Sequence, residues 1–151
     1  MKIRQANKFD LPEIIRMLLE FRNCTPVDKM RDCDNTEYAS KIFRHILLGA
    51  GVALVAEKQE QIIGMILGVI NPNVWDPDTK VLQELAYWVD IEHRNSSAGY
   101  RLLAEYNKTA EQLIKDNKID LYTMTKMQTS PDIDFSRFGY RKSEEIWVAG
   151  A

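Results

Sequence analysis

The chain has 151 residues, enough for one domain with a hydrophobic core and too few for two of ordinary size. Hydrophobic residues make up 45% of the chain and charged residues 28%, which favours a globular protein over a disordered one. The formal net charge of −2 excludes the broad positive field that recruits nucleic acids. We therefore expect a single domain over residues 1–151 that has no nucleic-acid partner.

The cysteine pattern and the apolar runs bear on the location of the protein. Cys24 and Cys33 lack the C-x-x-C spacing of a zinc or redox motif, so we expect two free thiols in a reducing cytosol. The first ten residues contain no apolar signal segment. The longest apolar run, Ile62–Ile70, is interrupted by two glycines and is too short to span a bilayer. These features predict a cytoplasmic protein without a membrane partner.

The first half of the chain predicts a strand, two helices and a hairpin. Apolar spacing of three and four residues marks the helices, and runs rich in Val, Ile and Leu mark the strands. Between the two helices lies a polar, irregular loop that contains both cysteines. In chain order we predict a strand at Lys2–Ala6, a helix from Leu11 to about Phe21, the loop Arg22–Asn35, a helix at Thr36–Leu48, and a hairpin over Gly51–Ile70 that turns at Lys58–Glu60.

The second half predicts three further strands and two further helices. In chain order these are a strand at Val81–Ile91, a helix at Gly99–Lys118, a strand at Ile119–Thr125, a short helix at Ser130–Phe138 and a closing strand at Ser143–Ala149. The strand, helix and strand from Val81 to Thr125 should form a parallel pair with a crossover. The element order β-α-α-β-β-β-α-β-α-β predicts an α/β fold with a mixed, mostly antiparallel sheet flanked by helices on both faces.

Small and polar residues, Asn95–Gly99, connect the Val81–Ile91 strand to the following helix. The first turn of a helix has backbone N–H groups without partners, and the helix dipole makes this end electropositive. Small residues would let a phosphate approach these groups, and Arg94 adds a positive charge beside them. The alternative is an ordinary helix start capped by Ser96 or Ser97.

Several motifs resemble those of the GNAT superfamily of N-acetyltransferases. Arg94-x-x-Ser97-x-Gly99 is similar to the family signature Gln/Arg-x-x-Gly-x-Gly/Ala, with serine at the first glycine position. Residues 88–94 resemble the fourth strand that leads into this loop, and residues 134–140 resemble the closing Tyr-x-x-x-Gly-Phe element. The element order is also that of the family, and the overall sequence pattern resembles that of small acetyltransferases of bacteriophages. The resemblance covers nearly the whole chain and implies a GNAT-like fold.

The resemblance implies acetyl-CoA as cosubstrate, bound without a metal ion. Its pantetheine arm would pair with the main chain of the fourth strand, and its pyrophosphate would take N–H groups of the following turn. Gln128 lies near the position of an asparagine that contacts the pantetheine in many relatives, and Phe135 would line the other side. The implied cofactor-binding residues are Val89, Ile91, Arg94, Asn95, Ser96, Ser97, Ala98, Gly99, Gln128 and Phe135.

Direct acetyl transfer needs a base for the amine and an acid for the leaving thiolate. By resemblance, Glu84 on the fourth strand is the candidate base, because its apolar neighbours would raise its pKa. The alternative is an exposed or ion-paired glutamate on the strand. The tyrosine that many relatives use as the acid is replaced by Phe135, which cannot donate a proton. His45 is either a surface residue or a second base.

Two functions remain open from the sequence. The resemblance implies an acetyl-CoA-dependent N-acetyltransferase that acts directly on a primary amine of a small molecule or a protein. The serine at position 97 and the phenylalanine at position 135 support the alternative, a catalytically weak acyl-CoA-binding or protein-interaction module on the same fold. The resemblance also favours a homodimer. The sequence does not identify the acceptor amine.

Overall fold

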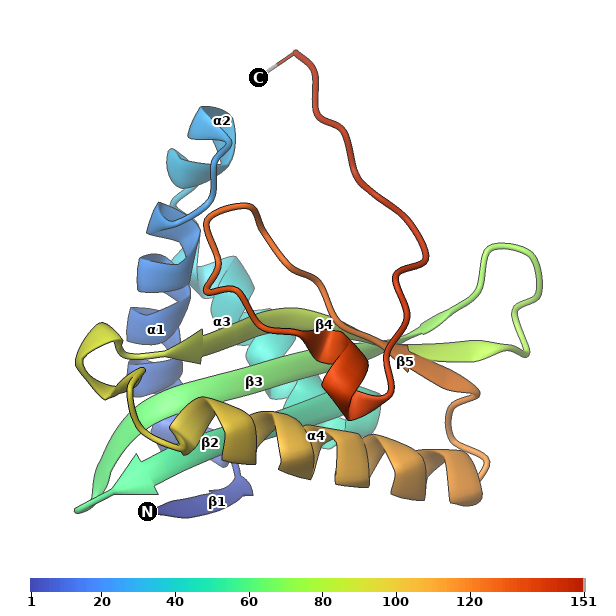
Figure 1. Ribbon diagram of the computed structural model, residues 1–151, viewed down its shortest axis with the longest axis horizontal. Coiled ribbons are helices and arrows are strands. Elements are labelled where there is room, and N and C mark those ends of the chain that lie inside the picture. The colour runs from blue at the N-terminus through green and yellow to red at the C-terminus, as the bar shows by residue number, and fades with distance from the viewer. Residues whose placement is uncertain (151) are drawn as a thin grey trace.

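The computed structural model describes residues 1–150, and five strands within them form one sheet (Figure 1). The strands are β1 (Lys2–Gln5), β2 (Gly51–Lys58), β3 (Gln61–Pro72), β4 (Lys80–Val89) and β5 (Leu121–Thr123). They lie side by side in sequence order, with antiparallel neighbours from β1 to β4 and a parallel pair between β4 and β5. The predicted mixed, mostly antiparallel α/β fold is confirmed.

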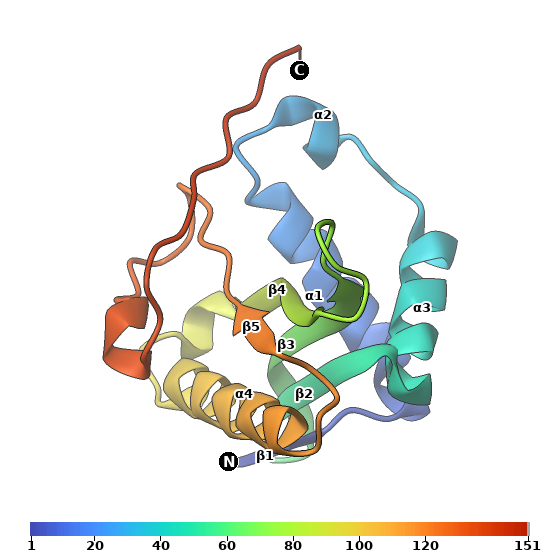
Figure 2. The same cartoon turned by 90° about the vertical axis from the view of Figure 1, so that its right-hand side faces the viewer.

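Helices cover both faces of the sheet. They are α1 (Leu11–Asn23), α3 (Thr36–His45) and α4 (Ala98–Lys115), whereas the one-turn helix α2 (Asp28–Arg31) lies away from the sheet (Figure 1). Helix α4 lies along one face, and α1 and α3 lie against the other (Figure 2). Helix α3 continues into a π-helical turn at Ile46–Ala50, and short 3-10 turns occur at Lys8–Asp10, Ile91–His93 and Phe135–Phe138. No helix within residues 1–150 is both long enough and apolar enough to cross a bilayer.

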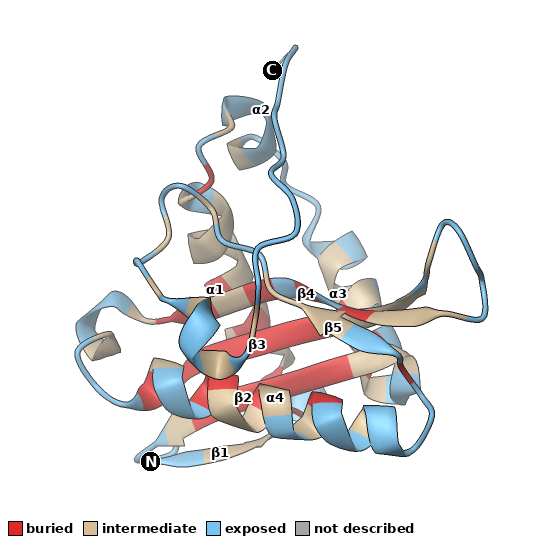
Figure 3. Cartoon of the chain, turned by 45° about the vertical axis from the view of Figure 1, so that its right-hand side comes forward, coloured by how far each residue is buried: buried red, intermediate tan, exposed pale blue. Residues whose placement is uncertain are grey.

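The buried residues concentrate in the sheet and on the helix sides that face it (Figure 3). Each face of the sheet carries its own apolar cluster, because side chains of a strand alternate between the two faces. The α4 side includes Leu54, Ile66, Leu82, Leu102 and Tyr106. The α1/α3 side includes Ile14, Met17, Phe43, Met65 and Trp88. The sheet is therefore held from both faces, which fixes the position of its central strands.

Two predicted elements near the C-terminus are wrong. Only the last part of the predicted helix Ser130–Phe138 is helical, because the Asp134 side chain accepts the Ser136 N–H and starts a short turn there. The predicted strand Ser143–Ala149 is an exposed segment without secondary structure. A strand needs a neighbour for its main-chain hydrogen bonds, and none of the described strands pairs with this segment. Figure 1 shows it leaving the body of the molecule.

Candidate functional site

The parallel strands β4 and β5 pair over only three residues each. Val81–Gln83 align with Leu121–Thr123. Past Gln83, β4 has no strand neighbour on this side among residues 1–150. The contact that follows comes from a side chain, because the Thr125 N–H donates to Glu84 Oε2 at 3.1 Å. The edge of β4 from Glu84 to Val89 is therefore open.

A β-bulge lies at the point where the two strands separate. Glu84 pairs with Gly68 of β3, whereas Ala86 pairs with Leu67, so Leu85 is an extra residue in β4. The bulge places Leu85 and Ala86 on the same face of the sheet, the one covered by α1 and α3. Glu84 faces α4 instead, like Gly68 opposite it, which lies against Tyr106 of α4. The bulge therefore brings Tyr87 and Val89 to the same face as Glu84, although each is an odd number of residues away from it.

Glu84 is a buried carboxyl group, with 4% of its surface exposed. Burial raises its pKa to about 7, and the N–H of Thr125 that its carboxylate accepts offsets part of this rise. Burial also raises the pKa of Tyr87 to about 12, with a further contribution from the negative charge of Glu84. A carboxyl group with a pKa near 7 can accept a proton at neutral pH and release it again. The sequence alternative of an exposed or ion-paired glutamate is therefore wrong.

The hydroxyl of Tyr106 lies over Gly68, opposite Glu84 in the sheet register. A Cβ atom on Gly68 would lie 2.6 Å from this hydroxyl oxygen, so only glycine leaves room for the ring. Tyr106 is fully buried, and its hydroxyl has no hydrogen-bond partner within the described chain. The surroundings of Glu84 on the α4 side are therefore tightly packed.

The main chain of Val89 points out of the open edge. The Asp90 N–H donates to the Ile63 carbonyl at 2.9 Å, which makes Gly64 and Val89 a non-hydrogen-bonded pair of the antiparallel ladder. The N–H and C=O of Val89 consequently face away from β3. Its carbonyl accepts Nε of Arg94 at 2.9 Å. The N–H of Val89 remains available to a ligand that lies along β4.

The turn between β4 and α4 presents several backbone donors. Ser96, Ala98 and Arg101 use their N–H groups in hydrogen bonds within the turn. The N–H groups of Ser97, Gly99 and Tyr100 have no partner among the described residues. They lie at the electropositive end of the 18-residue helix α4, where an anion is stabilised.

The two serines of this turn have different roles. Ser97 has φ −78°, so serine adopts the backbone of the motif position without strain. Ser97 is the N-cap residue but makes no capping hydrogen bond through its side chain. The Ser96 hydroxyl donates to the His93 carbonyl at 2.6 Å and accepts the Ala98 N–H at 3.2 Å. The Ser96 side chain therefore caps the start of α4, while the N–H groups of Ser97, Gly99 and Tyr100 stay available.

A family model described as the acetyltransferase (GNAT) family matches residues 15–140. The chain belongs to the GNAT acetyltransferase family. The match includes the open edge of β4, Glu84 and the turn before α4. The family resemblance of the sequence motifs is thereby confirmed.

Several solved structures have the same fold. A transcriptional regulator from Bacillus halodurans C-125 is 18% identical, with a TM-score of 0.70 over 99% of this chain and 98% of that chain. A predicted acetyltransferase with acetyl-CoA from Clostridium acetobutylicum is 14% identical, with a TM-score of 0.71 over 99% and 95%. An aminoglycoside acetyltransferase from an uncultured soil sample, in complex with sisomicin, is 16% identical, with a TM-score of 0.64 over 99% and 93%. No curated protein matches the sequence.

Two residues predicted in the GNAT cofactor site lie differently from the expectation. Strand β4 ends at Val89, and Ile91 lies in the 3-10 turn that follows, with 71% of its surface exposed. The predicted strand to Ile91 is therefore wrong, because the chain bends after Asp90. Arg94 stacks its guanidinium on the Trp88 ring, 4.5 Å from the ring centroid, and so fixes the turn to β4.

Gln128 and Phe135 lie on different parts of the segment after β5. Gln128 is exposed, and the hydroxyl of its neighbour Thr129 donates to the Cys24 carbonyl at the end of α1. Phe135 is half-buried and packs against the core cluster on the α4 side, next to Tyr140. The Tyr140 hydroxyl donates to Oδ1 of Asn107 at 2.6 Å. The structure thus associates Phe135 with α4 and places Gln128 near α1.

Sequence reasoning missed Tyr87 as a residue of the GNAT cleft. Tyr87 is two residues before Val89, so its main chain has the same outward direction in the ladder. Its hydroxyl lies beside Gly99, where a Cβ atom would be 2.9 Å away. Main-chain groups of β4 alternate between facing β3 and facing outward. This alternation could have identified Tyr87 from the sequence if the end of the strand had been known. The second outward-facing main chain, beside that of Val89, therefore belongs to Tyr87, whereas it was predicted for Ile91.

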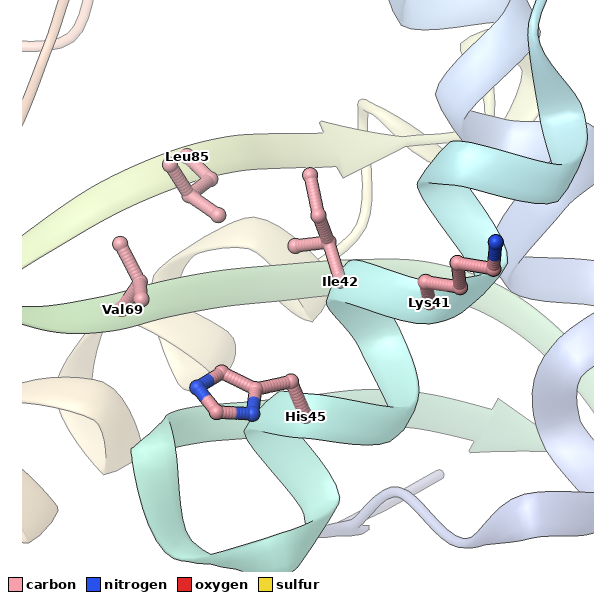
Figure 4. Close-up of a pocket in the computed structure, with 5 residues that line it drawn as sticks. All are labelled: Lys41, Ile42, His45, Val69 and Leu85. Atoms are coloured by element: carbon pink, nitrogen blue, oxygen red, sulfur yellow. The ribbon is translucent and has the colours of Figure 1, made fainter.

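A hollow of about 410 Å³ lies on the face of the sheet opposite α4. Lys41, Ile42 and His45 of α3 form one wall, and Val69 of β3 and the bulge residue Leu85 form the other (Figure 4). His45 is exposed, and its imidazole lines this hollow. Within residues 1–150, no three His, Cys, Asp or Glu side chains are arranged to hold a metal ion.

Proposed function

We propose that this GNAT protein transfers the acetyl group of acetyl-CoA directly to a primary amine of a small molecule or a protein. The observation that carries the proposal is the buried carboxyl group of Glu84 at the point where β4 and β5 separate. The proposal treats residues 1–151 as one acetyltransferase domain. Cys24 and Cys33 are both free thiols, which supports a reducing, cytoplasmic setting.

The open edge of β4 and the turn before α4 form the proposed acetyl-CoA site. The outward main chain of Tyr87 and Val89 would hydrogen bond to the pantetheine as an additional strand would. The free N–H groups of Ser97, Gly99 and Tyr100 would bind the pyrophosphate. Arg94, Asn95, Ser96 and Ala98 shape this turn, and Phe135 would line the site from the α4 side. Ile91 and Gln128 remain predicted contacts.

Glu84 is the proposed general base. The neutral amine attacks the thioester carbonyl, so that a C–N bond forms and the C–S bond breaks. Glu84 takes the proton that the amine nitrogen loses, either directly or through a water molecule. The Val89 N–H would stabilise the negative charge that develops on the carbonyl oxygen. CoA leaves as a thiolate and receives its proton from water or from a nearby hydroxyl.

One observation favours a second candidate function, an acyl-CoA-binding or protein-interaction module with little turnover. Phe135 offers no hydroxyl to protonate the thiolate, and the hydroxyl of its neighbour Tyr140 is engaged with Asn107. This candidate predicts cofactor binding without acetylation of any amine. By resemblance to the family we also propose a homodimer.

Calorimetric titration with acetyl-CoA tests the donor site, with desulfo-CoA and adenosine as controls. We expect micromolar affinity for acetyl-CoA and desulfo-CoA and no measurable affinity for adenosine, because the pyrophosphate carries the contacts with the turn. An amine panel with detection of released thiol then tests transfer. Binding without thiol release from any amine would support the second candidate. Absence of binding at millimolar acetyl-CoA would overturn the acetyltransferase and the acyl-CoA-binding module, and would leave only the protein-interaction module.

A further inference from the structure

The hollow between α3 and the bulge of β4 borders the proposed reaction centre from the face opposite α4. Leu85 lines the hollow, and its neighbour Glu84 points to the other face. On the α4 side the space next to Glu84 is filled by the ring of Tyr106. An amine at the open edge of β4 can therefore extend its remaining atoms only toward the α1/α3 side. The hollow is the space available there.

The lining of the hollow is mostly apolar, and the Lys41 ammonium points away from the other lining residues (Figure 4). Ile42, Val69 and Leu85 supply aliphatic surface, and no carboxylate lines the hollow. Lys41 is the permanently charged group in its wall, and the nearest recorded counter-charge is Glu37, one helical turn earlier, 3.3 Å from the Lys41 ammonium. His45 adds an imidazole. Such a surface accommodates alkyl groups and disfavours further charged groups, because they would lose their hydration there.

The acidic residues of the segment between α1 and α3, Asp28, Asp32 and Asp34, do not line the hollow. Asp28 pairs with Arg31, and Asp34 lies 3.9 Å from Arg22 of α1. The structure thus provides no carboxylate surface at the hollow for an amine with several positive charges.

From this combination we propose that the acceptor is a primary amine with one positive charge and an aliphatic body, and that the body occupies the hollow between α3 and Leu85. This inference rests on the proposed acetyltransferase function. It assigns Ile42, Val69 and Leu85 to specificity for the acceptor, because a second positive charge would lose its hydration against these side chains. These roles are separate from the transfer chemistry at Glu84.

The first test compares acceptors in the native protein with saturating acetyl-CoA. We expect kcat/KM to rise from propylamine to butylamine to hexylamine, by up to about fourfold for each methylene group that enters the hollow. Spermidine and an aminoglycoside should be at least tenfold poorer than hexylamine. Equal values for the three alkylamines, or a preference for spermidine, would overturn the proposal.

The second test reverses the charge at position 41. Lys41→Glu should raise kcat/KM for spermidine about fivefold and leave the value for hexylamine within twofold. Lys108→Glu is the matched control, because Lys108 is also an exposed helical lysine paired with a glutamate, and it lies on α4 at the other face of the sheet. The control should change neither value. An unchanged spermidine value in Lys41→Glu would contradict the placement of the acceptor in the hollow, because carboxylates at positions 37 and 41 would give its edge a net negative charge.

A binding measurement separates failure of this inference from failure of the proposed function. Methyl resonances of Ile42, Val69 and Leu85 are followed by NMR while hexylamine is added to the protein saturated with desulfo-CoA. Shifts at these methyl groups, and not at the exposed Val74, support the hollow as the binding site even if no amine is acetylated. Absence of shifts overturns the inference even if other amines are acetylated.

Discussion

Burial of Glu84 makes the stability of the protein depend on pH. Its pKa is raised from the ordinary value of 4.5 to about 7, so the folded state holds a proton between these values that the unfolded state has lost. The contribution of Glu84 to stability is therefore fully present below about pH 4.5 and is lost as the pH rises through about 7. The difference between the pKa values of the folded and unfolded states corresponds to about 3 kcal/mol in the free energy of unfolding.

Glu84→Gln should consequently have opposite effects on stability and activity. At pH 8 the variant should be more stable than the native protein by up to about 3 kcal/mol in urea unfolding, and the advantage should vanish near pH 4. Its kcat/KM should fall at least a hundredfold and lose the rise with pH near 7. Glu111→Gln, at an exposed position of α4, is the matched control. An unchanged pH profile of kcat/KM in Glu84→Gln would exclude Glu84 as the base.

Gly99 couples α4 to β4 through Tyr87. Alanine at this helical position should gain up to about 1 kcal/mol from its higher helix propensity. The added Cβ atom would lie 2.9 Å from the Tyr87 hydroxyl, however, so the gain should be cancelled in the native background. In a Tyr87→Phe background the gain should return, which gives a coupling of about 1 kcal/mol in a double-mutant cycle of urea unfolding. Additive effects would show that the hydroxyl moves aside without cost.

At this scale the sequence could predict groups near one another in the chain, and it could not predict groups that meet through the fold. Glu84 and the turn at Arg94–Gly99 were found because a local pattern and a family motif mark them. The hollow was missed because Val69 and Leu85 meet α3 only through the tertiary fold. Ile91 was misplaced because the bend after Asp90 leaves the apolar alternation intact.

Among the elements, β4 depends most on a single residue. Its bulge shifts the register so that Leu82 faces α4 whereas Ala86 and Trp88 face α1 and α3. Without the extra residue, side chains at an even spacing would share one face. Residues 85–89 are five consecutive apolar or aromatic residues, and this unbroken run does not reveal where the strand changes face.

Deletion of Leu85 should therefore be far more damaging than loss of its side chain. Removing the extra residue turns Ala86 through Val89 to the wrong faces, which buries Trp88 against α4 and exposes part of the other core. We expect loss of the cooperative urea transition, equivalent to more than about 4 kcal/mol. Deletion of the exposed Val74 in the β3–β4 loop is the control and should cost less than about 1 kcal/mol. Equal effects of the two deletions would show that the register adapts.

The strands that were predicted correctly have neighbours in the sheet, and the one that failed has none. The hairpin of β2 and β3 was predictable because its turn and both arms are contiguous in the chain. Ser143–Ala149 has the composition of a strand, but pairing depends on a free edge elsewhere in the molecule. The neighbouring β5 has only three residues, so composition alone could not decide the outcome.

For the molecule as a whole, the C-terminal segment should be dispensable for the fold. Residues 141–150 are exposed, and Ile146 and Trp147 have 80% and 87% of their surface accessible. Deleting residues 141–151 should change the Tm by less than about 2 °C, measured by circular dichroism. Tryptophan emission should shift to shorter wavelength, because an exposed indole is lost while Trp88 stays buried. A Tm lower by 5 °C or more would show that the segment pairs with the sheet in solution.

The one-residue bulge of β4 also has an evolutionary consequence. On the proposed assignment, it keeps Glu84, Tyr87 and Val89 of the donor site on one face of the strand, while Leu85 of the acceptor hollow lies on the other. Substitutions in α3 can then alter which amine is accepted while the turn that holds acetyl-CoA is preserved. Selection can act on the two sides almost independently, and a lineage with this strand could acquire new acceptors by changing few residues.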